Sequence, residues 1–452
     1  MGVWHIVNFQ TLFAGLDLSA EHYHPDKLHW LKIFRASNGK AVGEVARNSR
    51  NLTKQSATLS PTLPVFDLGA GSRHVLQRGD AIQEERVSTK KIVEAGDILV
   101  SRLRSYLRQV AIVPVNIPKA NVSSEFIVLR PINRVAIAFL LPFILSKQVQ
   151  TILAWSQDGN EHPRFHEKLL LELQIPPAIS AISGRLNDLV DQVDKLLFTA
   201  SEILTGAEAM LNNALGLADL DLTPRLFYEA RFADLSTAAR LDAEYFTPRT
   251  QNIIAALSRD GRAIADVANP AKRHFKPKPG QPFNYIEIAD LTVSGIAESK
   301  SISGEEAPSR AQWIVKPGDI ITSTVRPIRR LSAMILPEQR GFVCSSGFAV
   351  LQPKDVEPEI LLTYLRLPLV CELLDLKTTA SMYPAISTTD LLRIPISLPD
   401  KQARQAIAEK VRESFGARKR AKIILDTAKR AVEIAIEESE VAALRFLKGE
   451  RE

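Results

Sequence analysis

Cysteine is scarce in this chain of 452 residues, since Cys344 and Cys371 are the only two. They form no CxxC pair and no cluster with histidine, which disfavours zinc fingers, disulfide scaffolds and thiol redox motifs. Aromatic residues make up 6% of the sequence, and no apolar run reaches the length of a membrane-spanning helix. The amino-terminal segment shows no charged leader followed by an apolar block. We therefore expect a folded cytoplasmic protein that is neither secreted nor embedded in a membrane.

Motifs that carry catalysis are also missing. The sequence contains no G-x-S-x-G elbow, no Walker loop and no H-E-x-x-H pair. It also lacks the Asn-Pro-Pro-aromatic and Asp-Pro-Pro-Tyr tetrapeptides with which amino-methyltransferases hold a flipped base. These absences disfavour a chain that is itself an enzyme.

The charge balance is basic, with 57 Lys and Arg against 51 Asp and Glu and a formal net charge of +6. A basic surface prefers a polyanion to a neutral solute, so nucleic acid is the first partner to test. Hydrophobic residues make up 45% of the chain, and its length predicts two or three domains of ordinary size.

Two stretches carry a narrow apolar stripe with steps of three and four residues, which is typical of a coiled-coil helix. The first stripe consists of Ile182, Leu186, Leu189, Val193, Leu196, Ala200, Ile203, Ala207 and Met210. The second, rougher stripe consists of Ile407, Val411, Phe415, Ala421, Leu425, Ala428, Val432 and Ala435. Because one narrow stripe cannot be buried alone, the two helices are predicted to bury each other.

The chain also contains an internal repeat. Gly-Asp-Ile-Leu-Val-Ser at 96–101 recurs as Gly-Asp-Ile-Ile-Thr-Ser at 318–323, and Ser-Ser-Glu-Phe at 123–126 recurs as Ser-Ser-Gly-Phe at 345–348. Further matches follow in the same order at a nearly constant shift, including Glu21 with Glu244 and Ala207 with Ala428. Ordered matches of this kind indicate a duplication.

Each half is therefore predicted to be an α/β (α+β) module followed by a long helix, with the two helices paired as an antiparallel coiled coil. The predicted parts are a first module at 1–178, a helix at 179–217, a second module at 218–400 and a helix at 401–452. Apolar residues at helical spacing predict helices within 136–153 and 358–374. The variable stretches 41–86 and 266–306 are rich in Gly, Pro, Ser, Arg and Lys and are interpreted as loops.

Positive charge recurs on loops just beyond the predicted strands. In the first half the candidate DNA-contacting residues are Arg73, His74, Arg102, Arg104, Arg108 and Arg164. In the second half they are Lys272, Arg273, Lys276, Lys278, Arg326, Arg329, Arg330 and, as a weaker candidate, Tyr383. Arginine can pair with a guanine edge or with phosphate, whereas lysine acts as a point charge on the backbone. A solvated surface explains any one of these residues, but their recurrence at matching positions favours nucleic acid.

Other clusters are better explained without chemistry. His22 and His24 align with Tyr245 and Thr247 of the second copy, which are not a matching pair of histidines, so a metal site there is disfavoured. Asp97 and Asp319 recur and could be metal ligands of a nuclease, but a Gly-Asp turn before a strand explains them more simply.

The repeated Gly-Asp-Ile and Ser-Ser-x-Phe motifs, and the segment Ala-Ile-Ser-Thr-Thr-Asp-Leu-Leu-Arg-Ile-Pro-Ile-Ser-Leu-Pro at 385–399 that leads into the second helix, resemble the specificity subunit of type I restriction-modification enzymes. The resemblance covers nearly the whole chain. It implies two target recognition domains that each read one half of a split DNA sequence, with paired helices fixing their separation. At the usual rise, a helix of about 35 residues spans roughly 50 Å, which suits half-sites about one DNA turn apart.

The same resemblance implies which partners and cofactors the protein uses. The chain would bind double-stranded DNA and recruit two modification subunits and restriction subunits, while S-adenosylmethionine, ATP and magnesium would be bound by those partners and not by this chain. The helix entries Pro-Pro-Ala-Ile at 176–179 and Pro-Asp-Lys-Gln at 399–402 depart from the family's usual Pro-Pro-x-x-Glu-Gln. A divergent phage-defence subunit, a protein scaffold that binds no DNA, and a DNA-cleaving enzyme therefore stay open as alternatives.

Overall fold

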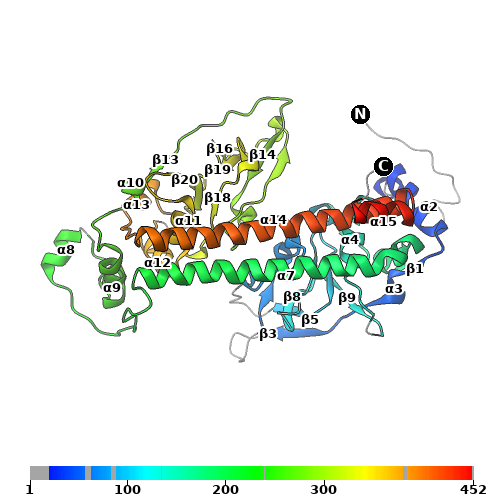
Figure 1. The fold of residues 1–452 in the computed structure, drawn as a ribbon, viewed down its shortest axis with the longest axis horizontal. Helices are drawn as coiled ribbons and strands as arrows, with labels where there is room; N and C mark the ends of the chain where they lie inside the picture. The colour runs from blue at the N-terminus through cyan, green and yellow to red at the C-terminus, as the bar shows by residue number, and fades with distance from the viewer. Residues whose placement is uncertain are drawn as a thin grey trace. The chain divides into compact units, whose positions relative to one another are not determined.

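The computed structural model describes residues 20–55, 63–82, 88–133, 135–238, 240–379 and 384–449. The chain divides into two compact units, one formed by Met1–Phe198 with Ala417–Glu452 and the other by Thr199–Gly416. Each unit contains part of both long helices, and we call the remainder of each unit module 1 and module 2 (Figure 1). Within the described residues, no helix has both the length and the apolar character needed to cross a membrane.

Module 1 is built on a four-stranded antiparallel sheet. Its strands, in spatial order, are β2 (Ala46–Asn48), β9 (Phe126–Pro131), β6 (Ile98–Ser101) and β7 (Val110–Ile112). Ile98 and Val100 of β6 face a core shared with helices, while Leu99 faces a separate core shared with the second sheet. Because both faces of β6 are covered, its sequence is continuously apolar and not alternating.

The second sheet of module 1 also has four strands. They are, in order, β3 (Leu52–Gln55), β5 (Ser88–Glu94), β8 (Lys119–Ser123) and β4 (Val65–Phe66). Only β4 runs parallel to its neighbour β8, and the other pairs are antiparallel.

Module 2 contains the same two kinds of sheet. The antiparallel sheet consists of β13 (Ala268–Pro270), β20 (Phe348–Pro353), β17 (Ile320–Ser323) and β18 (Ser332–Met334). The second sheet consists of β15 (Lys300–Ile302), β14 (Phe283–Ile286), β19 (Val343–Ser345) and β16 (Ala311–Ile314), with β14 parallel to β19. Ile320 of β17 faces the helices and Ile321 faces the second sheet, as their counterparts in β6 do.

Short helices cover the outer face of each antiparallel sheet. In unit 1 the α-helices besides the two long ones are α2 (Pro25–Ala36), α3 (Val42–Val45), α4 (Leu140–Leu145), α5 (Lys147–Ala154), α6 (Glu167–Glu172) and α15 (Glu440–Lys448). In unit 2 they are α8 (Phe232–Ala238), α9 (Pro248–Leu257), α10 (Ile264–Val267), α11 (Pro358–Arg366), α12 (Pro368–Leu376) and α13 (Thr388–Leu392).

The repeat also aligns Pro25 with Pro248, and these prolines explain where α2 and α9 begin. Pro25 and Pro248 occupy the first turn, where the missing amide proton costs nothing. The side chains of His24 and Thr247 cap these helices by accepting hydrogen bonds from the backbone N–H groups of Asp26 and Thr250.

Small two-stranded pairs complete module 1. β1 (Lys40–Ala41) pairs with β12 (Gln174–Ile175), and β10 (Gln157–Asp158) pairs with β11 (Arg164–Phe165). In module 2 the segment that corresponds to β12 forms only an isolated bridge between Ala263 and Pro395.

The long helices are α7 (Pro177–Ala214) and α14 (Lys401–Glu437). In unit 1 the start of α7, including Ile182 and Leu186, shares a core with the end of α14, including Val432. In unit 2 the end of α7, including Leu211, shares a core with the start of α14, including Ile407. The two helices are therefore antiparallel, and the predicted fold class of repeated α/β modules with a coiled-coil pair is confirmed (Figure 1).

Several details differ from the sequence predictions. The helix predicted over 401–452 ends at Glu437, and Ser439 caps the separate helix α15 with its hydroxyl. The predicted helices within 136–153 and 358–374 are each broken in two, at Ser146 and at Leu367 before Pro368. The stretches 41–86 and 266–306, interpreted as loops, carry strands of the sheets, because pairing with neighbouring strands satisfies their backbone groups.

Candidate nucleic-acid interface

Each module presents one short hairpin loop framed by two arginines, which we call the arginine loop. In module 1 it joins β6 to β7 and consists of residues 104–108; in module 2 it joins β17 to β18 and consists of residues 326–330. Arg104 and Arg108 have φ angles of 49° and 51°, and Arg326 and Arg330 have φ angles of 49° and 61°. A side chain other than glycine costs about 1–2 kcal/mol in this left-handed region. Because arginine occupies this costly conformation at all four positions, both loops are candidates for a functional role.

The backbone of both arginine loops is fixed in the same way. Arg104 donates its N–H to the carbonyl of Pro163 at 2.8 Å, and Arg326 donates its N–H to the carbonyl of Pro384 at 2.9 Å. Just before each loop, the hydroxyls of Ser101 and Ser323 bond to carbonyls two residues later. The loops are thus rigid supports, and we expect their geometry to vary little on binding.

A carboxylate organises the arginines beside the loop of module 1. Glu125 accepts a hydrogen bond from Arg102 Nε at 2.9 Å and two from Arg164, at 3.0 Å from Nε and 2.8 Å from Nη2. The hydrogen bonds from Arg164 lower the pKa of Glu125 to about 2, with a further contribution from Arg102. Glu125 is therefore ionised at neutral pH.

Further cations surround this pair. Arg50 forms an ion pair with Glu167, and Lys91 donates to the Phe126 carbonyl at 2.7 Å. Desolvation by burial, followed by the charge of Arg102, lowers the pKa of Lys91. Next to them lies a cavity of about 430 Å³, whose lining includes Arg50, Arg102, Arg164, His166, Asp158 and Glu167. The cavity walls thus combine three guanidinium groups with two carboxylates, which suits a polar, hydrogen-bonding ligand surface.

Module 2 shows a different distribution of charge. Lys272, Lys276 and Lys278 follow β13 and are exposed, as is Arg329 of the arginine loop. Exposed cations on one loop are typical of contacts to a phosphate backbone.

The side chains of Arg273, His74 and Arg330 are also held by partners inside the protein. Arg273 forms an ion pair with the buried Asp319 and donates from Nε to the Ile314 carbonyl at 2.9 Å. The ring of His74 lies 2.9 Å from the Val110 carbonyl, and burial lowers its pKa to about 4. Arg330 forms an ion pair with Glu208 of helix α7. DNA contact by these residues stays an untested prediction, and we leave them out of the proposed interface because their polar groups already serve the fold.

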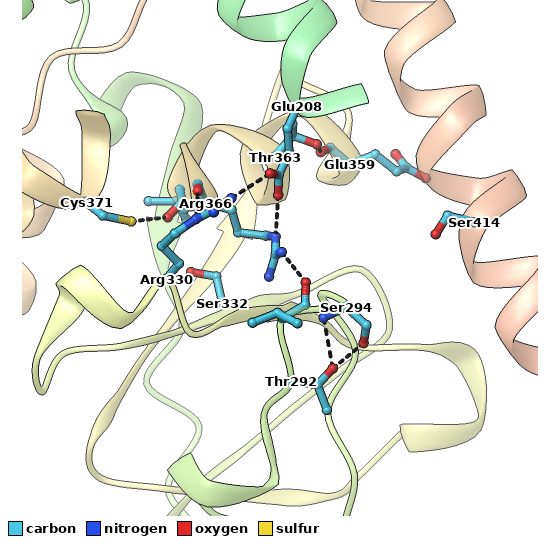
Figure 2. A network of polar contacts seen from close by, with 12 residues as sticks. Glu208, Thr292, Ser294, Arg330, Ser332, Glu359, Thr363, Arg366, Cys371 and Ser414 are labelled. Atoms are coloured by element: carbon cyan, nitrogen blue, oxygen red, sulfur yellow. Dashed lines mark hydrogen bonds and ion pairs between the residues drawn. The ribbon is translucent and has the colours of Figure 1, made fainter. Parts of the chain in front are cut away.

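Figure 2 shows the network that holds Arg330. Glu208 of α7 accepts from Arg330 Nη2 at 2.5 Å and from Arg366 Nε at 3.1 Å. Arg366 also donates to the Val293 carbonyl, and Arg330 Nε donates to the Arg366 carbonyl at 2.6 Å. Arg366 is only 3% exposed, and desolvation lowers its pKa. The network fastens the arginine loop of module 2 to the long helix.

The remaining candidates lie on or near the two arginine loops or outside the described residues. Arg104 donates from Nη2 to the Glu161 carbonyl at 3.2 Å, Arg108 is exposed, and Arg73 ends the 3-10 turn Leu68–Arg73. Arg326 begins the arginine loop of module 2, and Tyr383 lies outside the described residues. Sequence reasoning missed Glu125, Arg50, Lys91 and Glu208. For Glu125 a signal existed, since a charged residue replaces the glycine of the second Ser-Ser-x-Phe motif.

The two repeated aspartates serve turns. Asp97 and Asp319 accept hydrogen bonds from the N–H groups of Glu94 and Lys316, at 2.8 and 2.7 Å, beside glycines with φ of 87° and 84°. Asp97 also pairs with Arg130 at 2.7 Å, and Asp319 pairs with Arg273. Each buried carboxylate is thus neutralised by an arginine, which favours the structural interpretation over a metal site.

Comparison with known proteins finds similarity to one family of DNA specificity domains. Residues 262–416 match the family model for the type I restriction modification DNA specificity domain. No curated protein matches the chain at a significant level. The match confirms the resemblance to type I specificity subunits and covers most of module 2 with the start of α14.

Solved structures of such proteins also match. One comes from work on complex assembly and conformational transition of the type I R-M system, with 17% identity over 92% of this chain and 99% of that chain and a TM-score of 0.27. The HsdS subunit from Thermoanaerobacter tengcongensis has 17% identity, coverage of 91% and 96%, and a TM-score of 0.27. The S subunit from M. genitalium has 11% identity, coverage of 88% and 95%, and a TM-score of 0.35.

Proposed function

We propose that this chain is the DNA sequence-recognition subunit of a type I-like restriction-modification system. The observation that carries the proposal is the match of module 2 to a DNA specificity domain, together with the repetition of its sheets and arginine loop in module 1. Two DNA-recognition modules in one chain would bind a target that consists of two half-sites. Because their variable segments 41–86 and 266–306 differ in sequence, the two half-sites would differ as well.

Affinity and specificity would come from different side chains. Exposed cations such as Lys272, Lys276, Lys278 and Arg329 would bind phosphates, which makes affinity strongly dependent on salt. Side chains on and beside the rigid arginine loops would contact base edges in the major groove and choose the sequence.

Partner subunits would supply catalysis. We place two modification subunits and the restriction subunits on this chain, with S-adenosylmethionine, ATP and magnesium bound by them, in the cytoplasm. This proposal is supported by exposed apolar side chains in the segment before α9, where Leu226, Phe227, Phe232 and Leu241 are between 84% and 93% exposed. Asp97 is paired with Arg130, and Asp319 is paired with Arg273. Because both carboxylates are already engaged, these ion pairs support a role for this chain in recognition and not in cleavage.

A selection from random duplex DNA tests this function. The full-length protein is expected to select DNA that contains two short half-site sequences at a constant spacing. Its affinity should fall steeply between 50 and 200 mM salt, because about six to ten phosphate contacts are expected. Replacing residues 7–175 by the module of another such protein should change one half-site sequence and leave the other unchanged. A change in both half-sites, or in neither, would contradict the proposal that each module recognises its half-site independently. Binding that does not depend on salt would favour a protein scaffold.

A further inference from the structure

Arg102 and Arg164 share Glu125, but they are left with different capacities to bind a ligand. Arg164 uses Nε and Nη2 on Glu125 and Nη1 on the His162 carbonyl, so each of its nitrogens has a partner. Arg102 bonds to Glu125 only through Nε. Within the described part of the chain, neither Nη atom of Arg102 has a hydrogen bond, although its side chain is 42% exposed and lines the 430 Å³ cavity.

This geometry orients Arg102 for paired recognition. With Nε held by a carboxylate, the guanidinium plane cannot rotate freely, and the outer edge with its two Nη groups is presented to a ligand. Two parallel donors at that spacing match the O6 and N7 acceptors of guanine in the major groove. Holding the plane before binding reduces the rotamer freedom that is lost on binding.

The proposed function gives this geometry a specific meaning, and the inference rests on it. We propose that Arg102 reads a guanine in the half-site of module 1, and that Glu125 is the positioning residue that holds Arg102 for this contact through the pair it forms with Arg164.

Module 2 has no equivalent of the Arg102–Glu125 pair at the corresponding positions. By the repeat, Thr324 stands where Arg102 is and Gly347 stands where Glu125 is. Thr324 uses its N–H and its hydroxyl on the Gly347 carbonyl, both at 2.9 Å, so this position carries no cation. The guanine contact is therefore expected in one half-site only.

The experiment compares enriched sequences and binding constants for variants of the full-length protein. Arg102→Lys keeps the charge but removes the paired donors, and Glu125→Gln keeps the shape but removes the negative charge and one of the two oxygens that accept from the arginines. Both variants are expected to lose preference for a G·C pair at the same position of one half-site, by roughly 10- to 100-fold. Glu172→Gln, which removes an exposed carboxylate of the same module, is the matched control and should leave every position unchanged.

Glu125→Gly provides a second variant, because the corresponding turn of module 2 already accepts Gly347. It should relax the same position as Glu125→Gln. Melting temperature and circular dichroism establish that each variant is folded.

The outcomes separate the inference from the proposed function. If the unmodified protein enriches no two-part motif, the proposed function fails. If the motif is present but Arg102→Lys preserves every position, Arg102 does not select a base and the inference is overturned. If Arg102→Lys relaxes one position while Glu125→Gln and Glu125→Gly relax none, Glu125 has no positioning role and that half of the inference is overturned.

Discussion

The two modules share their scaffold but differ in the polar residues mounted on it. In both, an antiparallel four-stranded sheet carries a loop with two arginines whose backbone is in the left-handed region. A second sheet contains three corresponding strands, in the order β4-β8-β5 in module 1 and β14-β19-β16 in module 2. The fourth strand joins opposite edges, since β3 pairs with β5 whereas β15 pairs with β14. The variable segments thus change the edge of a sheet without altering its centre.

The polar differences occur as matched sets. The last residue of α11 is the buried Arg366, whereas the last residue of α4 is the apolar Leu145. Glu208 of α7 corresponds by the repeat to Lys429 of α14, which cannot pair with an arginine. A buried arginine therefore comes with its carboxylate in module 2, and neither is present in module 1. The comparison teaches that the modules share the backbone support of their arginine loops but differ in the side-chain interactions that fasten them.

The largest expected effect comes from removing the carboxylate of that set. Glu208→Gln leaves Arg366 buried without an ionised partner, which should destabilise unit 2 by about 3–5 kcal/mol. Glu208→Lys combined with Arg366→Leu copies module 1 and should recover most of this loss. Hydrogen exchange of peptides from Thr199–Gly416 measures the effect. Unchanged protection in the single variant would show that the network contributes no stability.

A smaller effect distinguishes the modules by pH. His74 and Gly295 are counterparts with φ of 62° and 77°, and their carbonyls accept hydrogen bonds from Ile112 and Met334 at 2.9 and 3.0 Å. Burial lowers the pKa of His74 from 6.5 to about 4, with Lys429 and Lys422 acting in the same direction. The unfolded chain therefore binds a proton that the folded chain excludes.

The stability contributed by a neutral His74 is complete above pH 6.5 and is lost as the pH falls from 6.5 to about 4. The loss is at most about 3 kcal/mol. His74→Gly, which copies module 2, should remove this component, so the difference in unfolding free energy between variant and parent should change over that pH range. A constant difference between pH 7 and pH 4 would contradict the assignment.

The smallest expected effects separate two corresponding arginines. Arg330→Ala removes a charged hydrogen bond to Glu208 and should cost about 1–2 kcal/mol of stability. Arg108 is exposed, so Arg108→Ala should change stability by no more than about 0.5 kcal/mol. It should instead weaken DNA binding and reduce the salt dependence by about one phosphate contact. Equal losses of stability in the two variants would show that the loops are fastened alike.

Much of the architecture could be predicted because it is written in local patterns. The Gly-Asp turns, the proline starts of α2 and α9 and the seam of α7 each depend on residues close together in the chain. The candidate interface was predicted less completely. Arg326, Arg329 and the lysines at 272, 276 and 278 follow from charge and repetition, but nothing in the sequence separated Arg329, which is exposed, from Arg330, which is bound to Glu208.

The sequence by itself determined the duplication, the paired helices and the places where positive charge is concentrated, because periodicity and repetition depend on order along the chain. Only the tertiary structure decided which charges are already neutralised. Arg330 meets Glu208 across 122 residues, and Arg164 meets Glu125 across 39. Such pairs form where distant segments are packed together, and the packing of the helices and sheets determines which side chains are left to bind DNA.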